Sequence, residues 1–285
     1  MIPFFAQPIL QLGPIAIHAF GVAVAIAMLV GTRAAERLFE RRGLDRGIGA
    51  RLAAWVLVGG FAGAHLFAVF FYKPHKLLDD PWLLFRFWED ISSFGGMLGG
   101  ITGAFLFFHA AAGSAARAHR WEYLGSIAQV FPVSLAIGRF GCALAHDHPG
   151  TVTTFPLAIS LRTQAAIDYI AAVYGEASRP LPRAVDAGTT QGFHDLGWYE
   201  FLFLALVIVP LFQLWQRRDR PGGFYLIAFP VLYLPVRFGL DFLRVSDVRY
   251  IGLTPAQWVA AIVFTMTLLL VALPSGPFRR SRCAR

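Results

Sequence analysis

The sequence predicts an all-α integral membrane protein with seven transmembrane helices. Its 285 residues are 56% hydrophobic and only 15% charged, which is far more apolar than a soluble domain. Seven apolar runs are each close to the length of about 20 residues that crosses the hydrocarbon core of a bilayer. Basic residues cluster between these runs, so the net charge of +8 indicates membrane topology rather than nucleic-acid binding.

The apolar runs place the expected helices in order along the chain. They cover roughly 15–32, 53–71, 92–111, 124–145, 198–215, 222–243 and 257–274. The first run lacks a basic stretch before it and leads straight into further spans, so we expect no cleavable signal peptide. Residues 146–197 contain four prolines and are too polar to cross. We therefore expect a single transmembrane domain over 1–285, in which 146–197 forms a long external connection, either a small head or a lid.

The distribution of basic residues orients the helices. Fifteen of the 25 Lys and Arg residues follow the first, third and fifth spans or lie in the C-terminal tail, and eight lie in the longer segments opposite. Because positive residues are enriched on the cytoplasmic side, we expect the N-terminus outside and the C-terminus in the cytoplasm. The polar residues near helix ends then gather toward the outer leaflet.

Two arginines lie within apolar runs, at Arg139 and Arg237. A charged side chain at the helix centre costs roughly 2.5–3.5 kcal/mol on insertion scales unless it is paired or hydrated. The guanidinium fork matches phosphate oxygens, so the pair indicates a pocket for an anion, most commonly a lipid phosphate. The alternatives are a snorkelling arginine at 139, and an ion pair between Arg237 and Asp241 on one helix face.

The other polar residues near these arginines each have more than one interpretation. His146 and His148 are acid–base groups, metal ligands together with Asp147, or parts of an ordinary polar loop. A metal is not expected, because a His-x-His pair projects both rings the same way on a strand but not on a helix. Cys142 is interpreted as a small apolar filler rather than a nucleophile. Glu200 lies just inside a span and requires a partner, for which an arginine is the obvious choice.

Two further features lie in the second and third spans. The third span opens with glycine pairs between Phe94 and Gly100, which predict close helix packing, or a close approach of lipid to the backbone. His65 in the second span is expected to have a hydrogen-bonded structural role.

The order and spacing of these motifs resemble those of the prolipoprotein diacylglyceryl transferases, bacterial inner-membrane enzymes that lipidate lipoprotein precursors. The likeness covers nearly the whole chain. The motifs are Leu12–His18 with Gly21, Ser93–Gly96, Gly-Arg-x-Gly at 138–141 with Gly150, His194 with Tyr199–Glu200, Tyr233, Arg237, Asp241–Phe242, Arg244, and Gly252–Gln257.

The resemblance implies an activity and a set of residues. In that family a diacylglyceryl group moves from phosphatidylglycerol to the lipobox cysteine of a prolipoprotein, a thioether forms and glycerol phosphate leaves. Arg139 would hold the headgroup, Arg237 would stabilise the departing phosphate, and Glu200 and Asp241 would orient both. The residues expected to bind substrate are Arg139, Phe94, Gly95, Gly96, Cys142, Asp147, Gly150, His194, Glu200, Tyr233 and Asp241.

The resemblance also implies partners and a location. We expect a multi-pass protein of the bacterial inner membrane, with 146–197 in the periplasm. Its partners would be phosphatidylglycerol, membrane lipid and a prolipoprotein signal peptide with its lipobox cysteine. No cofactor, no metal and no nucleic acid are expected.

The chain departs from the family pattern at several polar positions, and the loss of a histidine considered essential matters most. A general base contributes about 10²–10⁴-fold, so we expect a relocated base. His146, His148 and His65 are extra imidazoles, and the sequence does not choose among them. The departures are Phe94 for the usual His, Cys142 for Asn, Asp147 for Glu, Phe20 for Tyr and His65 for Arg.

Two other functions remain as alternatives. A divergent paralogue would bind phosphatidylglycerol without the usual transfer, or would modify a different acceptor, and the replaced polar groups motivate it. A transporter or receptor with seven helices would need a continuous polar path across the bilayer, whereas the polar residues crowd toward one leaflet.

Overall fold

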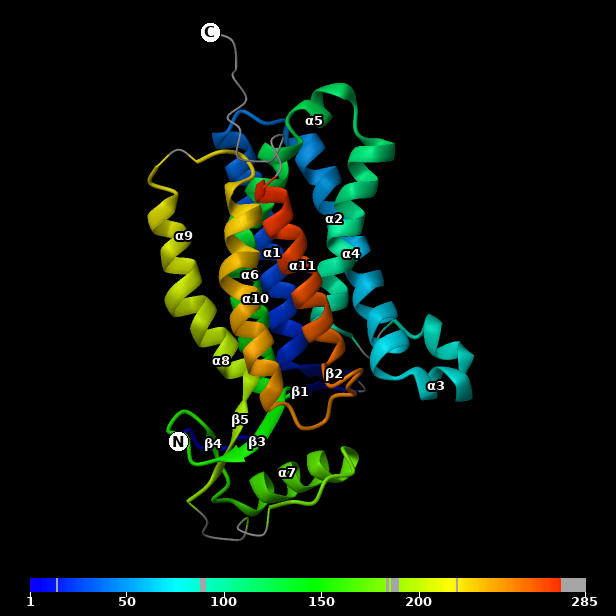
Figure 1. Cartoon of the computed structure of the whole chain (residues 1–285), viewed down its shortest axis with the longest axis vertical. Helices are drawn as coiled ribbons and strands as arrows, with labels where there is room; N and C mark the ends of the chain where they lie inside the picture. Colours follow the sequence, from blue (N-terminus) through cyan, green and yellow to red (C-terminus); the bar gives the residue numbers. More distant parts are fainter. Residues whose placement is uncertain (14, 88–90, 183–184, 186–189, 219, 273–285) are drawn as a thin grey trace. The chain divides into compact units, whose positions relative to one another are not determined.

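Seven helical segments dominate the structure, a computed structural model that describes residues 1–272 apart from 14, 88–90, 183–184, 186–189 and 219 (Figure 1). Each segment is long and apolar enough to cross a membrane. They are Ala19–Arg41, Arg46–Tyr72, Ser93–Ala111, Arg120–Ala145, Leu196–Trp215, Phe224–Leu243 and Pro255–Ala272. The predicted fold class, mostly helical with seven spans, is confirmed, and the orientation of the termini stays a prediction.

Three of the spans are single helices, and the other four contain an irregular turn. The single helices are α1 (Ala19–Arg41), α6 (Arg120–Ala145) and α11 (Pro255–Ala272). The others are α2 (Arg46–Phe67) with the π turn Ala68–Tyr72, α4 (Ser93–Leu106) with the π turn Phe107–Ala111, α8 (Leu196–Phe203) joined to α9 (Val209–Trp215) by the π turn Leu204–Ile208, and α10 (Phe224–Leu240) with the 3-10 turn Asp241–Leu243. Shorter elements between spans are α3 (Pro74–Asp79), the 3-10 turn Pro81–Phe85 and α5 (Ser114–Ala118).

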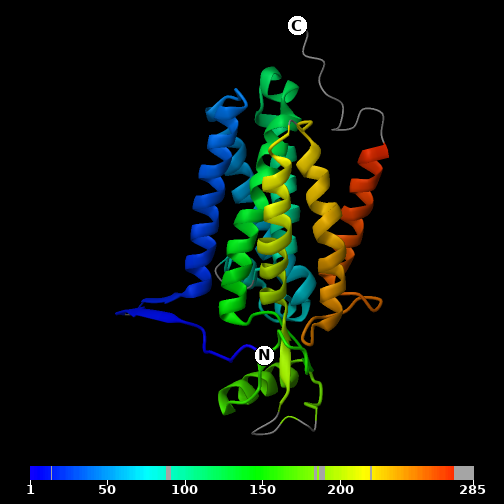
Figure 2. The ribbon, with the colours of Figure 1, turned by 90° about the vertical axis from the view of Figure 1, so that its left-hand side faces the viewer.

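The first span begins four residues later than its apolar run, because a β-hairpin precedes it. Strands β1 (Ile9–Leu12) and β2 (Ile15–His18) pair antiparallel, with Ile9 opposite His18. Gly13 has a φ of +61°, a left-handed conformation that glycine adopts without a steric penalty and that allows the chain to reverse. In Figure 2 this hairpin projects from the end of α1.

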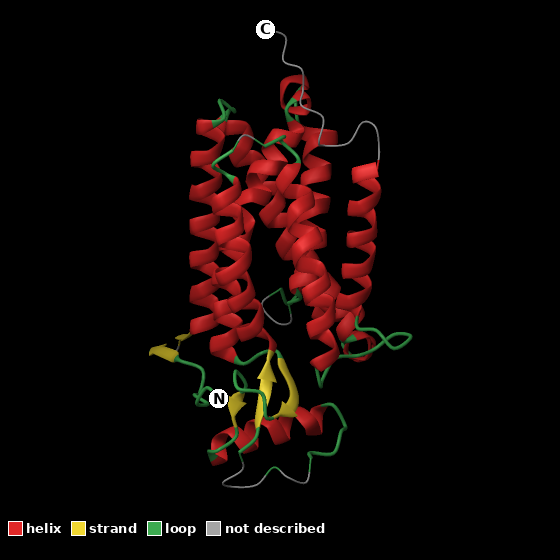
Figure 3. Ribbon diagram, turned by 60° about the vertical axis from the view of Figure 1, so that its left-hand side comes forward, coloured by secondary structure: helices red, strands yellow, loops and turns green. Residues whose placement is uncertain are grey.

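The segment 146–197 folds into a small sheet with a helix against it (Figure 3). Strands β3 (Pro149–Thr153), β5 (Gly192–Asp195) and β4 (Ile159–Ser160) pair antiparallel in that order. Helix α7 (Gln164–Glu176) begins after Thr163, whose side chain accepts a hydrogen bond from the backbone of Ala166. Apolar residues of the helix and the sheet form one buried cluster around Phe193. The described residues from 146 to 195 lie outside the seven spans, whereas Leu196 and Gly197, which the sequence analysis assigns to the connection, begin α8.

Contacts along the chain divide it into two compact units. The first comprises Met1–Val30, Phe131–Arg217 and Leu232–Val248, and the second comprises Gly31–Val130, Arg218–Val231 and Arg249–Arg285. The first unit thus holds both small sheets, α7, α8 and α9, together with parts of α1, α6 and α10. The second holds α2, α4 and the remaining helical segments.

Glycines set the packing of α2 against α4 in the second unit. A Cβ atom on Gly99 would lie 2.1 Å from the carbonyl oxygen of Gly59, and one on Gly63 would lie 2.5 Å from that of Gly95. Only residues without a side chain allow two helix backbones to approach this closely. This observation supports the helix-packing interpretation of the glycine pairs. On α2, His65 is fully buried and donates a hydrogen bond from Nε2 to the Leu83 carbonyl over 3.1 Å, which is the structural role expected for it.

Candidate functional site

A cluster of buried charged residues lies in the first unit. Arg139 is near the end of α6, Glu200 is in the second turn of α8, and Arg237 is in the last turn of α10. Their exposed fractions are 2%, 1% and 2%. Ions buried to this extent cost several kcal/mol each unless they are paired, so their contacts with one another decide whether the cluster is stable.

Local features of the sequence bring α8 against α6. Asp195 caps α8, because its Oδ1 accepts a hydrogen bond of 3.1 Å from the backbone N–H of Trp198. Gly197 then packs against the α6 backbone, where an added Cβ would lie 3.0 Å from the nitrogen of Ala143. This close approach carries Glu200 to Arg139.

Glu200 bridges the two arginines. Its Oε2 lies 3.0 Å from Nε of Arg139, and its Oε1 lies 3.2 Å from Nε of Arg237. Both are charge contacts rather than aligned hydrogen bonds. Tyr233 donates a hydrogen bond of 2.5 Å to the same carboxylate, and Asp241 accepts one from Nη1 of Arg237. Two guanidinium groups and two carboxylates therefore balance in charge.

Arg139 extends from Glu200 toward the residues that follow α6. Its Nη1 donates to Nε2 of His148 over 3.3 Å and lies 4.0 Å from the sulfur of Cys142. The contacts with Glu200, His148 and Cys142 involve Nε and Nη1, and Nη2 carries two further N–H donors. This geometry suits a guanidinium that is held in place on one side and binds an anion on the other.

The imidazole of His148 is oriented by its neighbour in the sequence. Nδ1 of His148 donates a hydrogen bond to Oδ1 of Asp147. Nε2 of the same ring lies 3.3 Å from Nη1 of Arg139, so the two ring nitrogens contact different partners. Burial alone would raise the pKa of the Asp147 carboxyl, but the His148 ring and the Arg139 charge hold it below its ordinary value. Asp147 thus remains an anion that fixes the ring.

Cys142, Asp147 and His148 offer three donor atoms that lie within 4.8 Å of one another, a geometry that could hold a metal ion. However, Nη1 of Arg139 contacts both the His148 nitrogen and the Cys142 sulfur, so a cationic group already lies beside two of the three donors. A second cation there would be repelled. These residues therefore fit an arginine-centred anion site better than a metal centre.

His146 is only two residues from His148, yet it makes different contacts. Its backbone has a φ of +51°, which is unusual for a residue with a side chain and turns the chain away after α6. Nδ1 lies 2.6 Å from the Asp195 carboxylate and Nε2 lies 3.1 Å from the carbonyl of Phe5. Both ring nitrogens are therefore engaged by groups of the protein itself. His146 therefore anchors the N-terminal segment to β5.

Comparison with known proteins decides the family. Residues 7–273 match the family model of prolipoprotein diacylglyceryl transferase. This chain belongs to that family. Three similar proteins, each named phosphatidylglycerol–prolipoprotein diacylglyceryl transferase, come from Escherichia fergusonii (28% identical, 96% of this chain and 91% of the relative), Methylibium petroleiphilum (27%, 90% and 91%) and Chromohalobacter salexigens (25%, 88% and 83%).

The other predicted site residues of the first unit lie beside the cluster or support it. Gly150 on β3 packs tightly, since an added Cβ would lie 2.9 Å from the carbonyl of Leu243. His194 on β5 is linked through Nδ1 to the hydroxyl of Tyr199 over 2.9 Å. Burial lowers the pKa of His194 from its ordinary value. These residues shape the segment that carries Glu200.

Three predicted residues lie in the second unit. Phe94 is buried at the start of α4. Gly95 is required for packing, because an added Cβ would lie 2.3 Å from Cβ of Phe67. At Gly96 an added Cβ would have only ordinary contacts, at 3.6 Å. A role of these residues in binding substrate stays a prediction.

Two supporting residues were not predicted as part of the site. Asp195 caps α8 and holds His146, and its place directly before an apolar run is the usual signal of a helix N-cap. Tyr169 on α7 donates a hydrogen bond to the carbonyl of His146. The partners are 23 residues apart, and no local sequence pattern indicates that pairing.

Proposed function

We propose that this chain transfers a diacylglyceryl group from phosphatidylglycerol to the lipobox cysteine of a prolipoprotein in the bacterial inner membrane. The names of its relatives state this donor and this class of acceptor. Family membership and seven apolar spans support a membrane enzyme of this type. The observation that carries the proposal is the pair of buried arginines bridged by Glu200.

The arginine pair fits the leaving group of this reaction. The acceptor sulfur would form a bond to the diacylglyceryl carbon, and the bond from that carbon to the phosphate oxygen would break. Glycerol phosphate leaves with one more negative charge than the phosphodiester had. Groups placed where charge develops stabilise the transition state most, and Arg139 and Arg237 supply two fixed positive charges in a buried site. In the proposal, Glu200 and Asp241 hold both guanidinium groups in place before the lipid arrives.

His148 is the base that the geometry favours among the three histidines left open by the sequence. Asp147 orients its ring through Nδ1, and Nε2 faces Arg139, so Nε2 is the nitrogen that would take the proton. Both nitrogens of His146 already contact Asp195 and Phe5, and Nε2 of His65 donates to Leu83. In the proposal, the thiol proton moves to Nε2 of His148 as sulfur attacks, and Arg139 turns from that nitrogen toward the phosphate.

The test is a transfer assay with purified chain in phosphatidylglycerol nanodiscs and a synthetic peptide that contains a lipobox cysteine. Mass spectrometry would detect the thioether-linked product, and released glycerol phosphate would be measured in parallel. We expect His148→Gln to reduce turnover by about 10²–10⁴-fold. His75→Gln, which removes an exposed imidazole on α3, is the matched control and should leave turnover unchanged.

Two results would overturn parts of the proposal. Wild-type turnover by His148→Gln would mean that the base lies elsewhere. A well-folded chain that binds phosphatidylglycerol through Arg139 but forms no thioether with any peptide would instead be the divergent paralogue that binds lipid without transfer. The reason to consider this alternative is that Phe94, Cys142 and Phe20 stand where the resemblance implies polar residues.

A further inference from the structure

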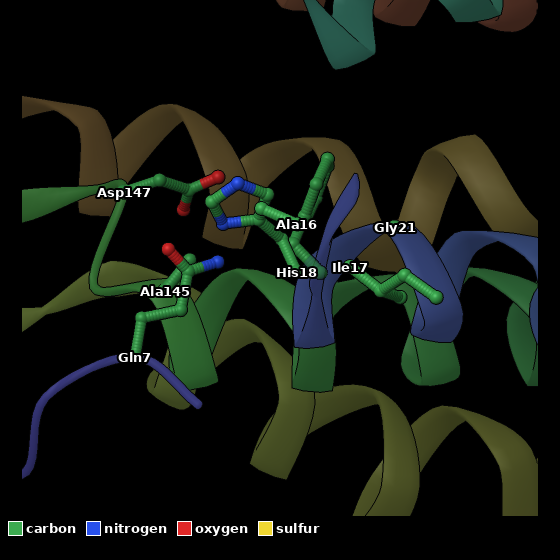
Figure 4. Close-up of a pocket in the computed structure, with 8 residues that line it drawn as sticks. Gln7, Ala16, Ile17, His18, Gly21, Ala145 and Asp147 are labelled. Carbon is green, nitrogen blue, oxygen red and sulfur yellow. The ribbon is translucent and has the colours of Figure 1, made fainter. Parts of the chain in front are cut away.

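A cavity in the first unit is lined in part by Asp147, the residue that orients the proposed base. It has a volume of about 490 Å³, and its lining includes Ala16–His18 of β2, Gly21 of α1, Gln7, and Asp147 after α6. Figure 4 shows the side chains of Gln7, His18 and Asp147 converging on it. Because Asp147 also contacts His148, a group bound in this cavity would lie beside the residue that orients the proposed proton acceptor.

The chemistry of this lining does not suit a phosphate. Among the described residues that line the cavity there is an acid, Asp147, and neither a lysine nor an arginine. The low pKa of that carboxyl keeps it negative, so an anion would be repelled. The amide of Gln7, the imidazole of His18 and the carboxylate instead match the N–H and C=O groups of a peptide. A two-substrate transferase needs a separate place for its uncharged acceptor, and this cavity has the corresponding chemistry.

Strand β2 also presents an open edge to an incoming chain. Within the described part of the protein it pairs only with β1, in a two-stranded sheet. An extended peptide can add to such an edge through backbone hydrogen bonds. Small residues on the lining, Ala16 and Gly21, leave room for a short side chain such as that of cysteine. On β1, Ile9 and Leu10 are 50% and 60% exposed, which gives the hairpin an apolar surface suited to an apolar signal peptide.

We propose that this cavity and the open edge of β2 bind the extended acceptor segment of the prolipoprotein, with its cysteine directed toward Asp147 and His148. The inference rests on the proposed function, because it assigns the second substrate of the same reaction. In this arrangement the phosphate binds at the arginines and the thiol at the hairpin.

Gly21 offers a sharp test. An added Cβ at this helical glycine meets no atom within 4 Å and the backbone is not left-handed, so Gly21→Leu should fill the cavity without straining the fold. We expect KM for the peptide to rise about tenfold or more, as when a pocket loses room for its ligand, with the affinity for phosphatidylglycerol unchanged. Ala25→Leu, which adds the same side chain one turn further along α1 at an exposed position, should change neither value.

The failure of this inference can be told apart from failure of the proposed function. Ala16→Cys should trap the cysteine of the acceptor peptide as a mixed disulfide without any transfer step, well above the level trapped by wild type or by Ala25→Cys. Trapping without transfer would support the docking site and contradict the proposed function. Transfer with equal KM for Gly21→Leu and wild type, and with no trapping at Ala16→Cys, would overturn the docking site alone.

The strand-pairing geometry has its own signature. In a strand that adds to a sheet edge, alternate backbone N–H groups face the neighbouring strand. Peptides methylated at one backbone nitrogen at a time should therefore lose affinity at every second position around the acceptor cysteine. An even loss at all positions would show that the peptide does not pair with β2.

Discussion

Replacing Glu200 by Gln is the most informative perturbation of the site. The substitution keeps the shape of the side chain and removes the one carboxylate that contacts both Arg139 and Arg237. Arg237 keeps Asp241 as an ion partner, whereas Arg139 loses its closest carboxylate. The amide group would also direct N–H donors at guanidinium N–H groups, a repulsive arrangement.

The expected cost follows from the distances. At 3.0 Å and an effective dielectric constant near 20, a unit charge pair has a Coulomb energy of about 5 kcal/mol, which desolvation opposes. Removing one partner of a buried pair costs about 3–5 kcal/mol. We expect the free energy of unfolding to fall by that amount and the apparent Tm to fall by roughly 10 °C. Tyr233→Phe removes only one hydrogen bond to the same carboxylate and should cost less, about 1.5–3 kcal/mol.

The assay is thermal unfolding of the purified variants in neutral detergent, with and without phosphatidylglycerol. In Glu200→Gln the arginines lack their shared counterion, so a phosphate-bearing lipid should stabilise this variant more than it stabilises wild type. A neutral diacylglycerol should not. A Tm for Glu200→Gln equal to that of wild type, or a smaller lipid effect than in wild type, would refute the description of this cluster as a preformed anion site.

Three further predictions use matched pairs or a pH series. Arg237→Ala should lower transfer by about 10²–10³-fold. Arg244→Ala should have a much smaller effect in the same assay, because the close partner of Arg244 is Asp247 at 2.9 Å and its contact with Asp241 is long, at 3.9 Å. Gly99→Ala should destabilise by about 1–3 kcal/mol in thermal unfolding, because its Cβ would lie 2.1 Å from a backbone oxygen, whereas Gly60→Ala at 3.4 Å should be nearly neutral. Burial lowers the pKa of His194 below 6.5, so its contribution to stability is present above that pH and is lost on acidification, and His194→Gln should flatten the fall in Tm between about pH 7 and 5.

The sequence predicts the spans well because hydrophobic length is a local property. All seven spans lie where the apolar runs indicate, and the errors are at their ends. The first helix was expected near residue 15, but Ile15–His18 pairs with β1 instead. Apolar residues count equally in a helix and a strand when only hydropathy is considered, so the hairpin was not visible.

Pairing within the site could be predicted where the partners are close in the chain or chemically obliged to pair. Arg237 and Asp241 share a helix face, and a buried Glu200 requires a cation. The interaction of His146 with Asp195 could not be predicted, because the two residues are 49 positions apart and only the tertiary structure, in which Asp195 ends β5, brings them together. Long-range polar contacts of this kind depend on tertiary packing rather than on sequence spacing.

The two histidines after α6 show how the backbone conformation decides which groups a side chain contacts. The sequence presents them as equivalent candidates, since they flank the same aspartate and both follow an apolar run. The left-handed conformation at His146 turns its ring toward Asp195 and Phe5, and the chain then brings His148 back to Arg139. One imidazole becomes a fixed anchor and the other faces Arg139. If His148 is the base, then the base, the orienting Asp147 and both arginines all lie in the first unit. Phe94 lies in the second unit, so its presence there removes none of these four groups.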